Sequence, residues 1–406
     1  MPGPGGEGEL TDGHETREGG RPAWWLTTFF AHTVLVQTIT FVLRPTATYH
    51  ALELDVSVQW LGLLGASFAV FPLLVAIPSG RAVDRLGERR VMVAGGVLIV
   101  LSAVLFVLAA GSVAGLVVAI MVLGLGHLGS VVAQQALVAN RTPAGRYDTA
   151  FGRYTFATSA GQAVGPGLIL VFGGGKTIPD TGAIFAWSLL PAALILGLAV
   201  VLPGSTHRNA IALESRDGVR ELVRRPGMLR ALLVSCVVLA AVDISLVYIP
   251  ALGAEQNIAS GTIGLLLALR AGASMLSRLF LGRIVAAAGR RTTLVSSIAL
   301  SAAALLVVPV PQPTWQLGFL VILLGLGLGA GQPLTMSWLA EATPPGLRGR
   351  AMSLRLTGNR IGQVLLPSGA GFLAVGTGAG GVLVLTAAGL AAVGLVARSI
   401  PQPRRD

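Results

Sequence analysis

Cysteine and lysine are almost absent from this chain of 406 residues, which contains one of each, Cys236 and Lys176. A single cysteine excludes an internal disulfide and a cysteine-based metal cluster. The sequence has no phosphate-binding loop of the Gly-x4-Gly-Lys-Ser/Thr type, so hydrolysis of a nucleotide by this chain is not expected. It also has no cluster of metal ligands and no nucleophile with a base and an orienting group. We therefore expect no enzymatic activity, no catalytic residues, no bound metal and no cofactor.

Charged residues are scarce as well. They make up 12% of the chain, against about 25% in a typical soluble domain, whereas hydrophobic residues make up 53%. A helix of about 20 apolar residues crosses the hydrocarbon core of a bilayer. Twelve stretches of this kind predict an all-α membrane protein with twelve transmembrane helices. The predicted spans are residues 24–48, 57–79, 91–111, 113–138, 151–173, 181–203, 229–253, 260–282, 292–310, 315–340, 351–375 and 378–400.

The net charge of +11 comes from arginines that are unevenly distributed. Nearly all of them lie in connections that follow even-numbered spans, whereas the other connections hold Lys176 and several acids. Because positively charged loops stay on the cytoplasmic side, both termini are predicted to be cytoplasmic, in tails at residues 1–22 and 401–406. The first tail is expected to be disordered and not to be a signal peptide. Abundant Arg, Ala and Gly favour a bacterial cytoplasmic (inner) membrane, and nucleic acid is not an expected partner.

The two halves of the sequence repeat each other at an offset of 201 to 202 residues. Gly62-Leu63-Leu64 matches Gly264-Leu265-Leu266, and Gly161-Gln162 matches Gly362-Gln363. Six spans in each half give both halves the same orientation, so their symmetry axis is predicted to follow the membrane normal. The predicted domains are an N-terminal bundle at residues 23–203, a cytoplasmic linker at 204–228 with a short surface helix at 214–225, and a C-terminal bundle at 229–400.

The connection between the second and third spans reads Gly80-Arg81-Ala82-Val83-Asp84-Arg85-Leu86-Gly87-Glu88-Arg89-Arg90. It resembles the signature loop of the major facilitator superfamily, and the six-plus-six arrangement is similar to that family's fold of two pseudo-symmetric six-helix bundles. Glycines at both ends would permit a tight turn, with the acid near a helix N-terminus. The resemblance implies a latch that closes the cytoplasmic side against the eleventh span; the alternative is a solvated loop that only fixes topology. The candidate latch residues are Gly80, Asp84, Arg85, Gly87, Arg89 and Arg90.

The second half carries an incomplete copy of this loop, in which Ala286 replaces the acid. Asp148 lies at the start of the fifth span, which the second loop is expected to face. We therefore consider Asp148 as a substitute acid for Arg283 or Arg290.

The fifth span resembles the front of a motif carried by exporters of the same superfamily. Ile169 and Leu170 stand where that motif ends in two glycines, so the match is partial. Glycine and proline would allow this helix to bend and to pack closely on a neighbour. The alternative is a generic packing feature without a transport role. The matching residues are Gly152, Gly161, Gly165 and Pro166.

Polar side chains inside the spans are few, and each needs a partner or a function. Thr33, Gln37, Thr40 and Arg44 are spaced four, three and four residues apart, which places them on one face of the first span. In the resembled family, spans 1, 4, 7 and 10 line the central pathway, and here all four carry polar residues. Such residues can equally tie helices together. Further candidates for the substrate cavity are Ser130, Gln134, Tyr248, Ser274, Gln332, Thr335, Asn359 and Arg360.

Asp243 is the only acid deep inside a span, and Arg270 in the next span lies at a similar depth. Their pairing, and its disruption by substrate or helix motion, is one physical way to couple a proton to a cargo; a permanent structural ion pair is the alternative. Aligning Tyr49 with Tyr248 places Arg44 opposite Asp243 in the repeat, which makes Arg44 a rival partner. His32 and His127 are further proton-carrying candidates, with hydrogen-bonded packing as the alternative.

These observations favour a secondary transporter that works by alternating access around a midplane site, with a proton gradient as its energy source. The partial exporter motif and the lightly polar pathway favour proton-coupled efflux, by antiport, of a hydrophobic or amphipathic compound. Buried Arg44, Arg270 and Arg360 favour instead uptake or export of an organic anion. A third hypothesis is a non-transporting sensor or scaffold. The expected partners are a small-molecule substrate and membrane lipid, the latter near Arg355, and the chain is expected to act as a monomer.

Overall fold

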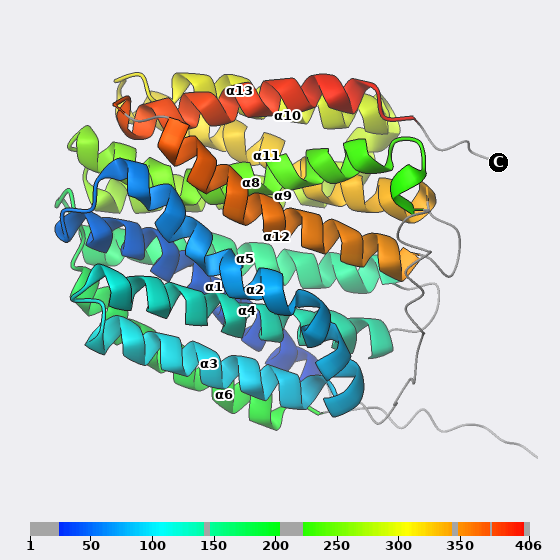
Figure 1. Ribbon diagram of the computed structural model, residues 1–406, viewed down its shortest axis with the longest axis horizontal. Coiled ribbons are helices and arrows are strands. Elements are labelled where there is room, and N and C mark those ends of the chain that lie inside the picture. Colours follow the sequence, from blue (N-terminus) through cyan, green and yellow to red (C-terminus); the bar gives the residue numbers. More distant parts are fainter. Residues whose placement is uncertain (1–23, 142–146, 204–221, 343–347, 374–375, 402–406) are drawn as a thin grey trace, which may run out of the picture.

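The computed structural model describes residues 24–141, 147–203, 222–342, 348–373 and 376–401, which form long α-helices and no strands (Figure 1). The helices of the first half are α1 (Trp24–Glu53), α2 (Val58–Leu86), α3 (Glu88–Leu108), α4 (Val113–Arg141), α5 (Tyr147–Gly173) and α6 (Thr181–Val201). Those of the second half are α8 (Met228–Glu255), α9 (Ser260–Ala288), α10 (Arg290–Val307), α11 (Thr314–Ala342), α12 (Arg348–Leu373) and α13 (Gly378–Arg398).

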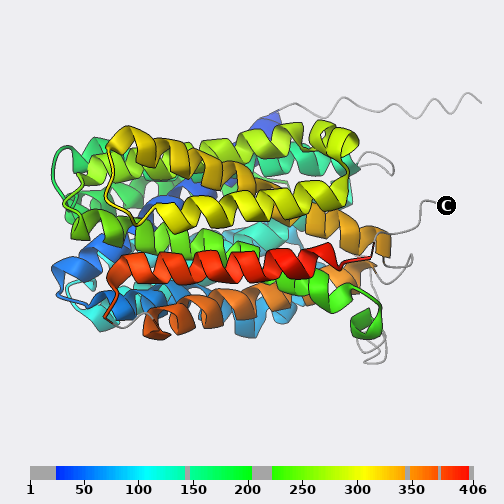
Figure 2. The same ribbon diagram turned by 90° about the horizontal axis from the view of Figure 1, so that it is seen from above.

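The helices lie side by side in two adjoining six-helix bundles, as predicted (Figures 1 and 2). The packing repeats: α3 lies against α4 and α6, and α10 lies against α11 and α13. The bundles meet where α5 packs on α9, α2 on α12 and α1 on α8. We call the end where α1 begins and α13 ends the inner end, following the predicted topology, and the opposite end the outer end (Figure 1).

Eleven of the twelve helices in the described ranges are long and apolar enough to cross a membrane. The exception is α12, whose four arginines, together with Asn359 and Gln363, lower its mean hydropathy. It still packs lengthwise against α2 and α8, so its buried cations have to find partners within the protein. The predicted N-terminal tail lies outside the described residues, as do the C-terminal tail beyond Pro401 and most of the predicted surface helix at 214–225, of which only 222–224 are described as helical.

The signature loop differs from its prediction because the helix before it is longer than expected. Gly80 is not at a turn: it lies inside α2, which continues to Leu86. The turn is made by Gly87 alone, whose φ of 85° is a left-handed value that favours glycine. In the second half, Gly289 makes the equivalent turn between α9 and α10, with a φ of 80°. Each pair of helices is thus joined by a single glycine.

The predicted latch is only partly placed by the structure. Asp84 lies in the last turn of α2 and not at a helix N-terminus, and its side chain is outside the described part of the chain. Glu88, at the start of α3, is 1% exposed and accepts a hydrogen bond of 2.5 Å from Asn140 Nδ2 of α4. Arg85, Arg89 and Arg90 are exposed. Arg81 and Asp148 also have side chains outside the described set.

Acids at the outer end connect the last helix of each half to the first. Glu255, the final residue of α8, accepts a hydrogen bond of 2.9 Å from the backbone N–H of Ala379 in the first turn of α13. In the other half, Glu53 at the end of α1 accepts a hydrogen bond of 2.7 Å from Thr181, the first residue of α6. Both carboxylates lie where the helix dipole favours a negative charge.

Loss of the Glu255 carboxylate should therefore destabilise the second bundle. Thr377, the N-cap residue of α13, provides no side-chain cap of its own. We expect Glu255→Ala to lower the free energy of unfolding by about 1 kcal/mol, the usual cost of losing a helix cap. Glu255→Gln keeps an acceptor and should lose less. Thermal unfolding in detergent measures both, and an Ala variant as stable as the wild type would contradict the capping role.

Candidate functional site

The central helices α1 and α8 are buried unevenly along their lengths. Every residue from 36 to 49 of α1 and from 243 to 253 of α8 is buried. Toward the inner end, buried residues alternate with exposed ones such as Leu229, Arg230 and Leu233. The outer halves of both helices are thus enclosed on all sides, whereas their inner halves keep an uncovered face.

An ion pair joins the two bundles within this enclosed region. Arg44 Nη1 of α1 lies 2.6 Å from Asp243 Oδ1 of α8, and each side chain is 6% exposed. The two residues occupy equivalent positions in the repeat, like Tyr49 and Tyr248 five residues further on in each helix. The pair therefore lies across the pseudo-symmetry axis, with opposite charges contributed by the two halves. The Arg44 guanidinium also lies 4.4 Å from the centre of the Phe68 ring.

Two residues of α12 extend this ion pair into a chain of polar contacts. Gln363 Nε2 donates a hydrogen bond of 2.5 Å to Asp243 Oδ2. Its own Oε1 accepts one of 2.9 Å from Arg360 Nη1. Both carboxylate oxygens of Asp243 are therefore occupied, one by a cation from the first half and one by an amide from the second half.

The predicted Asp243–Arg270 contact is wrong for this conformation. Within the described residues, Asp243 is paired with Arg44, the rival that the repeat alignment indicated. The prediction rested on the similar depths of Asp243 and Arg270 within their spans. Depth, however, does not determine which way a side chain points. Arg270 is 2% exposed, and its Nε is buried without a hydrogen-bond partner among the described residues.

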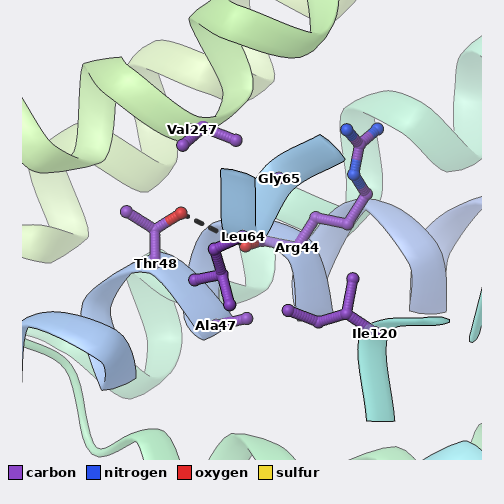
Figure 3. A pocket seen from close by; sticks show the side chains of 7 residues that line it. All are labelled: Arg44, Ala47, Thr48, Leu64, Gly65, Ile120 and Val247. Atoms are coloured by element: carbon purple, nitrogen blue, oxygen red, sulfur yellow. Dashed lines mark hydrogen bonds between the residues drawn. The ribbon is translucent and has the colours of Figure 1, made fainter. Parts of the chain in front are cut away.

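Figure 3 shows a small pocket beside the ion pair, at the junction of α1, α2, α4 and α8. Its volume is about 10 Å³, enough for about one water molecule. The Arg44 guanidinium points away from Thr48, on the opposite side of the pocket (Figure 3). In this conformation the pocket is too small to hold a cargo. Its lining residues are Arg44, Ala47, Thr48, Leu64, Gly65, Ile120 and Val247.

Both candidate histidines of the first bundle contact glutamines. His127 Nε2 lies 3.3 Å from Gln37 Nε2, and His32 Nδ1 lies 2.8 Å from Gln134 Nε2. Tyr154 donates a hydrogen bond of 3.2 Å to Gln134 Oε1, which fixes that amide. A ring nitrogen that faces an amide N–H acts as an acceptor, so each imidazole is held in a neutral form. This geometry favours the packing interpretation of both histidines.

A second polar cluster lies in the inner half of the second bundle, and sequence reasoning missed its centre, Ser235. Ser235 Oγ donates a hydrogen bond of 3.0 Å to Asn359 Oδ1 and accepts one of 3.2 Å from Arg355. Arg355 also donates a hydrogen bond of 2.6 Å to Gln332. The prediction that Arg355 lies at the lipid interface is wrong: the residue is 6% exposed and faces the interior, because these polar groups solvate its charge.

The remaining predicted cavity residues mostly bond to helix backbones. The hydroxyls of Thr33, Thr40 and Thr335 donate to carbonyls of the preceding turn, and Ser274 donates across to Gly325 of α11. Each hydroxyl has a single proton, which it donates to a backbone carbonyl. In this conformation these four residues therefore have no donor left for a cargo. Ser130 Oγ and Tyr248 Oη are buried without a described partner.

Arg278 was also missed by sequence reasoning. It lies on α9 eight residues after Arg270, and its Nη1 donates a hydrogen bond of 2.8 Å to Ser159 of α5, which joins the two bundles. The signal that could have found it is the spacing, because residues eight apart share a helix face.

The seam between the bundles at the outer end depends on glycines packed against prolines. Gly62 of α2 lies so close to the carbonyl of Pro367 in α12 that a Cβ has no space. The repeat places Gly264 of α9 against Pro166 of α5, where a Cβ would lie 2.8 Å from the proline carbonyl. The same surfaces are thus used twice, as in a symmetric dimer.

The exporter-like glycines of α5 allow close packing within the first bundle. Cβ atoms at Gly161 and Gly165 would collide with α1, whereas the space around Gly152 is open. Two of the three predicted glycines therefore allow close packing, and α5 runs as one helix from Tyr147 to Gly173 with Pro166 inside it.

Comparisons with known proteins agree with this architecture. The sequence model of the Major Facilitator Superfamily matches residues 29–256 and 231–406. The structure is similar to that of a D-xylose-proton symporter (TM-score 0.78, 15% identity, covering 94% of this chain and 98% of that one). It is also similar to a mutant of the nucleoside transporter NupG (TM-score 0.77, 13% identity, 93% and 99% covered). A mutant peptide transporter POT in complex with sulfate is a third relative (TM-score 0.73, 16% identity, 94% of each chain covered).

No curated protein sequence matches the chain. The similarity to solved structures at such low identity establishes the fold alone. The family assignment rests on the sequence model, which covers nearly the whole chain in two overlapping matches, one for each half. This multi-pass membrane protein is a member of the Major Facilitator Superfamily.

Proposed function

We propose that the protein is a secondary active transporter that exports a hydrophobic or amphipathic compound in exchange for protons. The observation that carries the proposal is the Arg44–Asp243 ion pair, which joins the two bundles within the enclosed stretches of α1 and α8. Asp243 is the only acid deep within a described span, and it is therefore the natural proton carrier.

The geometry suggests how a proton would be coupled to the cargo. Arg44 and Asp243 belong to different bundles, so any movement that separates the outer ends of α1 and α8 has to break the pair. A carboxylate without its cation in a low-dielectric interior gains a proton more readily than a paired one. Outward opening would therefore load Asp243, and closure around Arg44 would expel the proton toward the inner side.

We propose export as the direction of cargo movement, supported by the partial exporter motif of α5. The enclosed outer ends of α1 and α8 and the glycine–proline seam favour a conformation that receives cargo from the inner side. We place the protein in a bacterial cytoplasmic membrane with both termini inside, where this side faces the cytoplasm.

A second candidate function is transport of an organic anion. It is favoured by the excess of buried cations around one acid, since Arg270 and Arg360 both lie within electrostatic range of Asp243. A sensor or scaffold built on the same fold would have no need for an ion pair between its moving halves, and no described feature favours it.

Proton movement in reconstituted vesicles tests the proposal. Liposomes that contain the protein and an internal pH dye receive an imposed proton gradient and then lipophilic cations, neutral drugs or organic anions in turn. We expect at least one class to cause proton movement that is absent from protein-free liposomes. Cargo movement with no accompanying protons would contradict the coupling, and the absence of transport for all classes would favour a sensor.

A further inference from the structure

Arg270 is a buried cation without a counterion. Its side chain lies at the middle of α9, the whole residue is 2% exposed, and its Nε is buried without a hydrogen-bond acceptor. A guanidinium carries five N–H donors, and the one on Nε of Arg270 has no acceptor among the described residues. An isolated charge in a protein interior is costly and is normally compensated by a partner.

The neighbouring acid does not fill this role. Asp243 is within electrostatic range of Arg270, but its two oxygens are bound to Arg44 and Gln363. Arg360 adds a second guanidinium within range of the same carboxylate. One negative charge thus lies within electrostatic range of three positive ones.

The face of α9 that carries Arg270 continues toward the inner end. Ser274, Ser277 and Arg278 follow at spacings of four, seven and eight residues, which keeps them on the same side of the helix. Arg278 is partly exposed, so this face extends from the buried centre to the region that cargo would enter from the inner side. A negatively charged group on this route is attracted toward Arg270 by two cations on one helix.

We propose that Arg270 binds an anionic group of the cargo, so that the transported compound is an amphipathic anion with a carboxylate, sulfonate or phosphate. This proposal rests on the proposed function as a transporter, but not on the coupling ion or the direction. Two oxygens of a carboxylate, sulfonate or phosphate can accept parallel hydrogen bonds from a guanidinium, so the residue selects the cargo by both charge and geometry.

Fluorescent probes that share a fluorophore and differ in charge test the site directly. Dansylglycine, dansylglycinamide and dansylethylenediamine share one fluorophore and carry a carboxylate, a neutral amide and an ammonium group. Purified full-length protein in lipid nanodiscs is titrated with each, and binding is followed by fluorescence polarisation. We expect dansylglycine to bind at least about tenfold more tightly than dansylglycinamide, the usual gain from a hydrogen bond to a charged group. Dansylethylenediamine should bind most weakly.

Variants assign the preference to one residue. Arg270→Gln should bind dansylglycine and dansylglycinamide equally, whereas Arg270→Lys should keep a preference for the carboxylate because it keeps the charge. Arg355→Gln is the matched control, since Arg355 is also buried but is already bonded to Gln332 and Ser235. It should keep the full preference. Size-exclusion profiles establish that each variant is folded.

The outcomes separate this proposal from the proposed function. Equal affinities of the wild type for the carboxylate and the amide, or a preference that survives Arg270→Gln, would overturn the anion site. The titrations use no gradient, so a preference that depends on residue 270 supports the site even if no proton movement is found in vesicles. Conversely, proton-coupled transport of the ammonium probe without any carboxylate preference would support the transporter and refute the site.

Discussion

Asp243→Asn will abolish cargo-dependent proton movement in reconstituted vesicles, reducing it to the level of protein-free liposomes. The amide has nearly the shape of the carboxylate and can still accept a hydrogen bond from Gln363, but it cannot carry a proton. The substitution also leaves Arg44 buried without its counterion. Removal of one partner of a buried pair costs about 3–5 kcal/mol, so we expect the variant to unfold at a lower temperature as well.

A double variant separates these two effects. Arg44→Gln combined with Asp243→Asn removes both charges, so the stability should largely return, because replacing a buried pair with neutral groups is often close to neutral. Proton movement should not return, because no carboxylate is present. The matched control is Asp180→Asn, which replaces an exposed N-cap acid at the outer end with another good capping residue and should leave proton movement unchanged. Coupled transport by the double variant would refute Asp243 as the proton carrier.

Most of the fold could be predicted from the sequence because the bilayer imposes a strong length rule. Every predicted span corresponds to a helix, and the repeat correctly indicated two similar bundles. Errors arose at the inner ends, where α2 and α9 continue for about two turns beyond the apolar stretch. Hydropathy detects where a helix leaves the lipid and not where it ends. The end is set by backbone conformation, and Gly87 and Gly289 hold the positive φ values that stop each helix.

The site was predictable to the extent that burial of charge is costly. Asp243 was identifiable because an acid within a span needs a reason to be there. Its partner was not settled by depth, and the repeat alignment was the better guide, since it placed Arg44 at the equivalent position across the axis. Ser235 and Glu88 gave no signal, because a serine in a span is common and an acid after a glycine turn looks solvated. Their importance depends on Asn359 and Asn140, which approach from distant parts of the chain.

The ion pair and the outer seam together constrain how the molecule can move. The bundles are in backbone contact on both sides of the axis, through Gly62 against Pro367 and through Gly264 against Pro166. Between these two contacts, Arg44 is paired with Asp243. The Tyr248 hydroxyl occupies the space beside both Gly62 and Gly371, so α8 is locked between α2 and α12. Outward opening has to separate all of these contacts together, which favours a two-state movement over gradual deformation.

A side chain added to the seam should therefore hold the outer side open. Leucine at Gly62 or Gly264 cannot fit against the facing proline carbonyl while the seam is closed. Overpacking of this kind costs about 1–3 kcal/mol, and a penalty of that size on one state shifts a two-state equilibrium by about 5- to 150-fold. We expect Gly62→Leu and Gly264→Leu to populate the outward-open state and to slow transport, because the return to the closed state becomes unfavourable.

Labelling of a buried position at the outer end measures this shift. Thr48 is 1% exposed in the closed conformation and lines the pocket beside Arg44, and Cys236 is the only native cysteine. In a Cys236→Ala background, Thr48→Cys should react slowly with a membrane-impermeant maleimide added from outside. Gly62→Leu or Gly264→Leu should accelerate that reaction by the same 5- to 150-fold, on the order expected from the coupling energy. Gly272→Leu is the control, because it lies on the same helix as Gly264 with open space around it and should not change the rate. Equal rates in all four proteins would mean that the glycine–proline seam does not control access from the outer side.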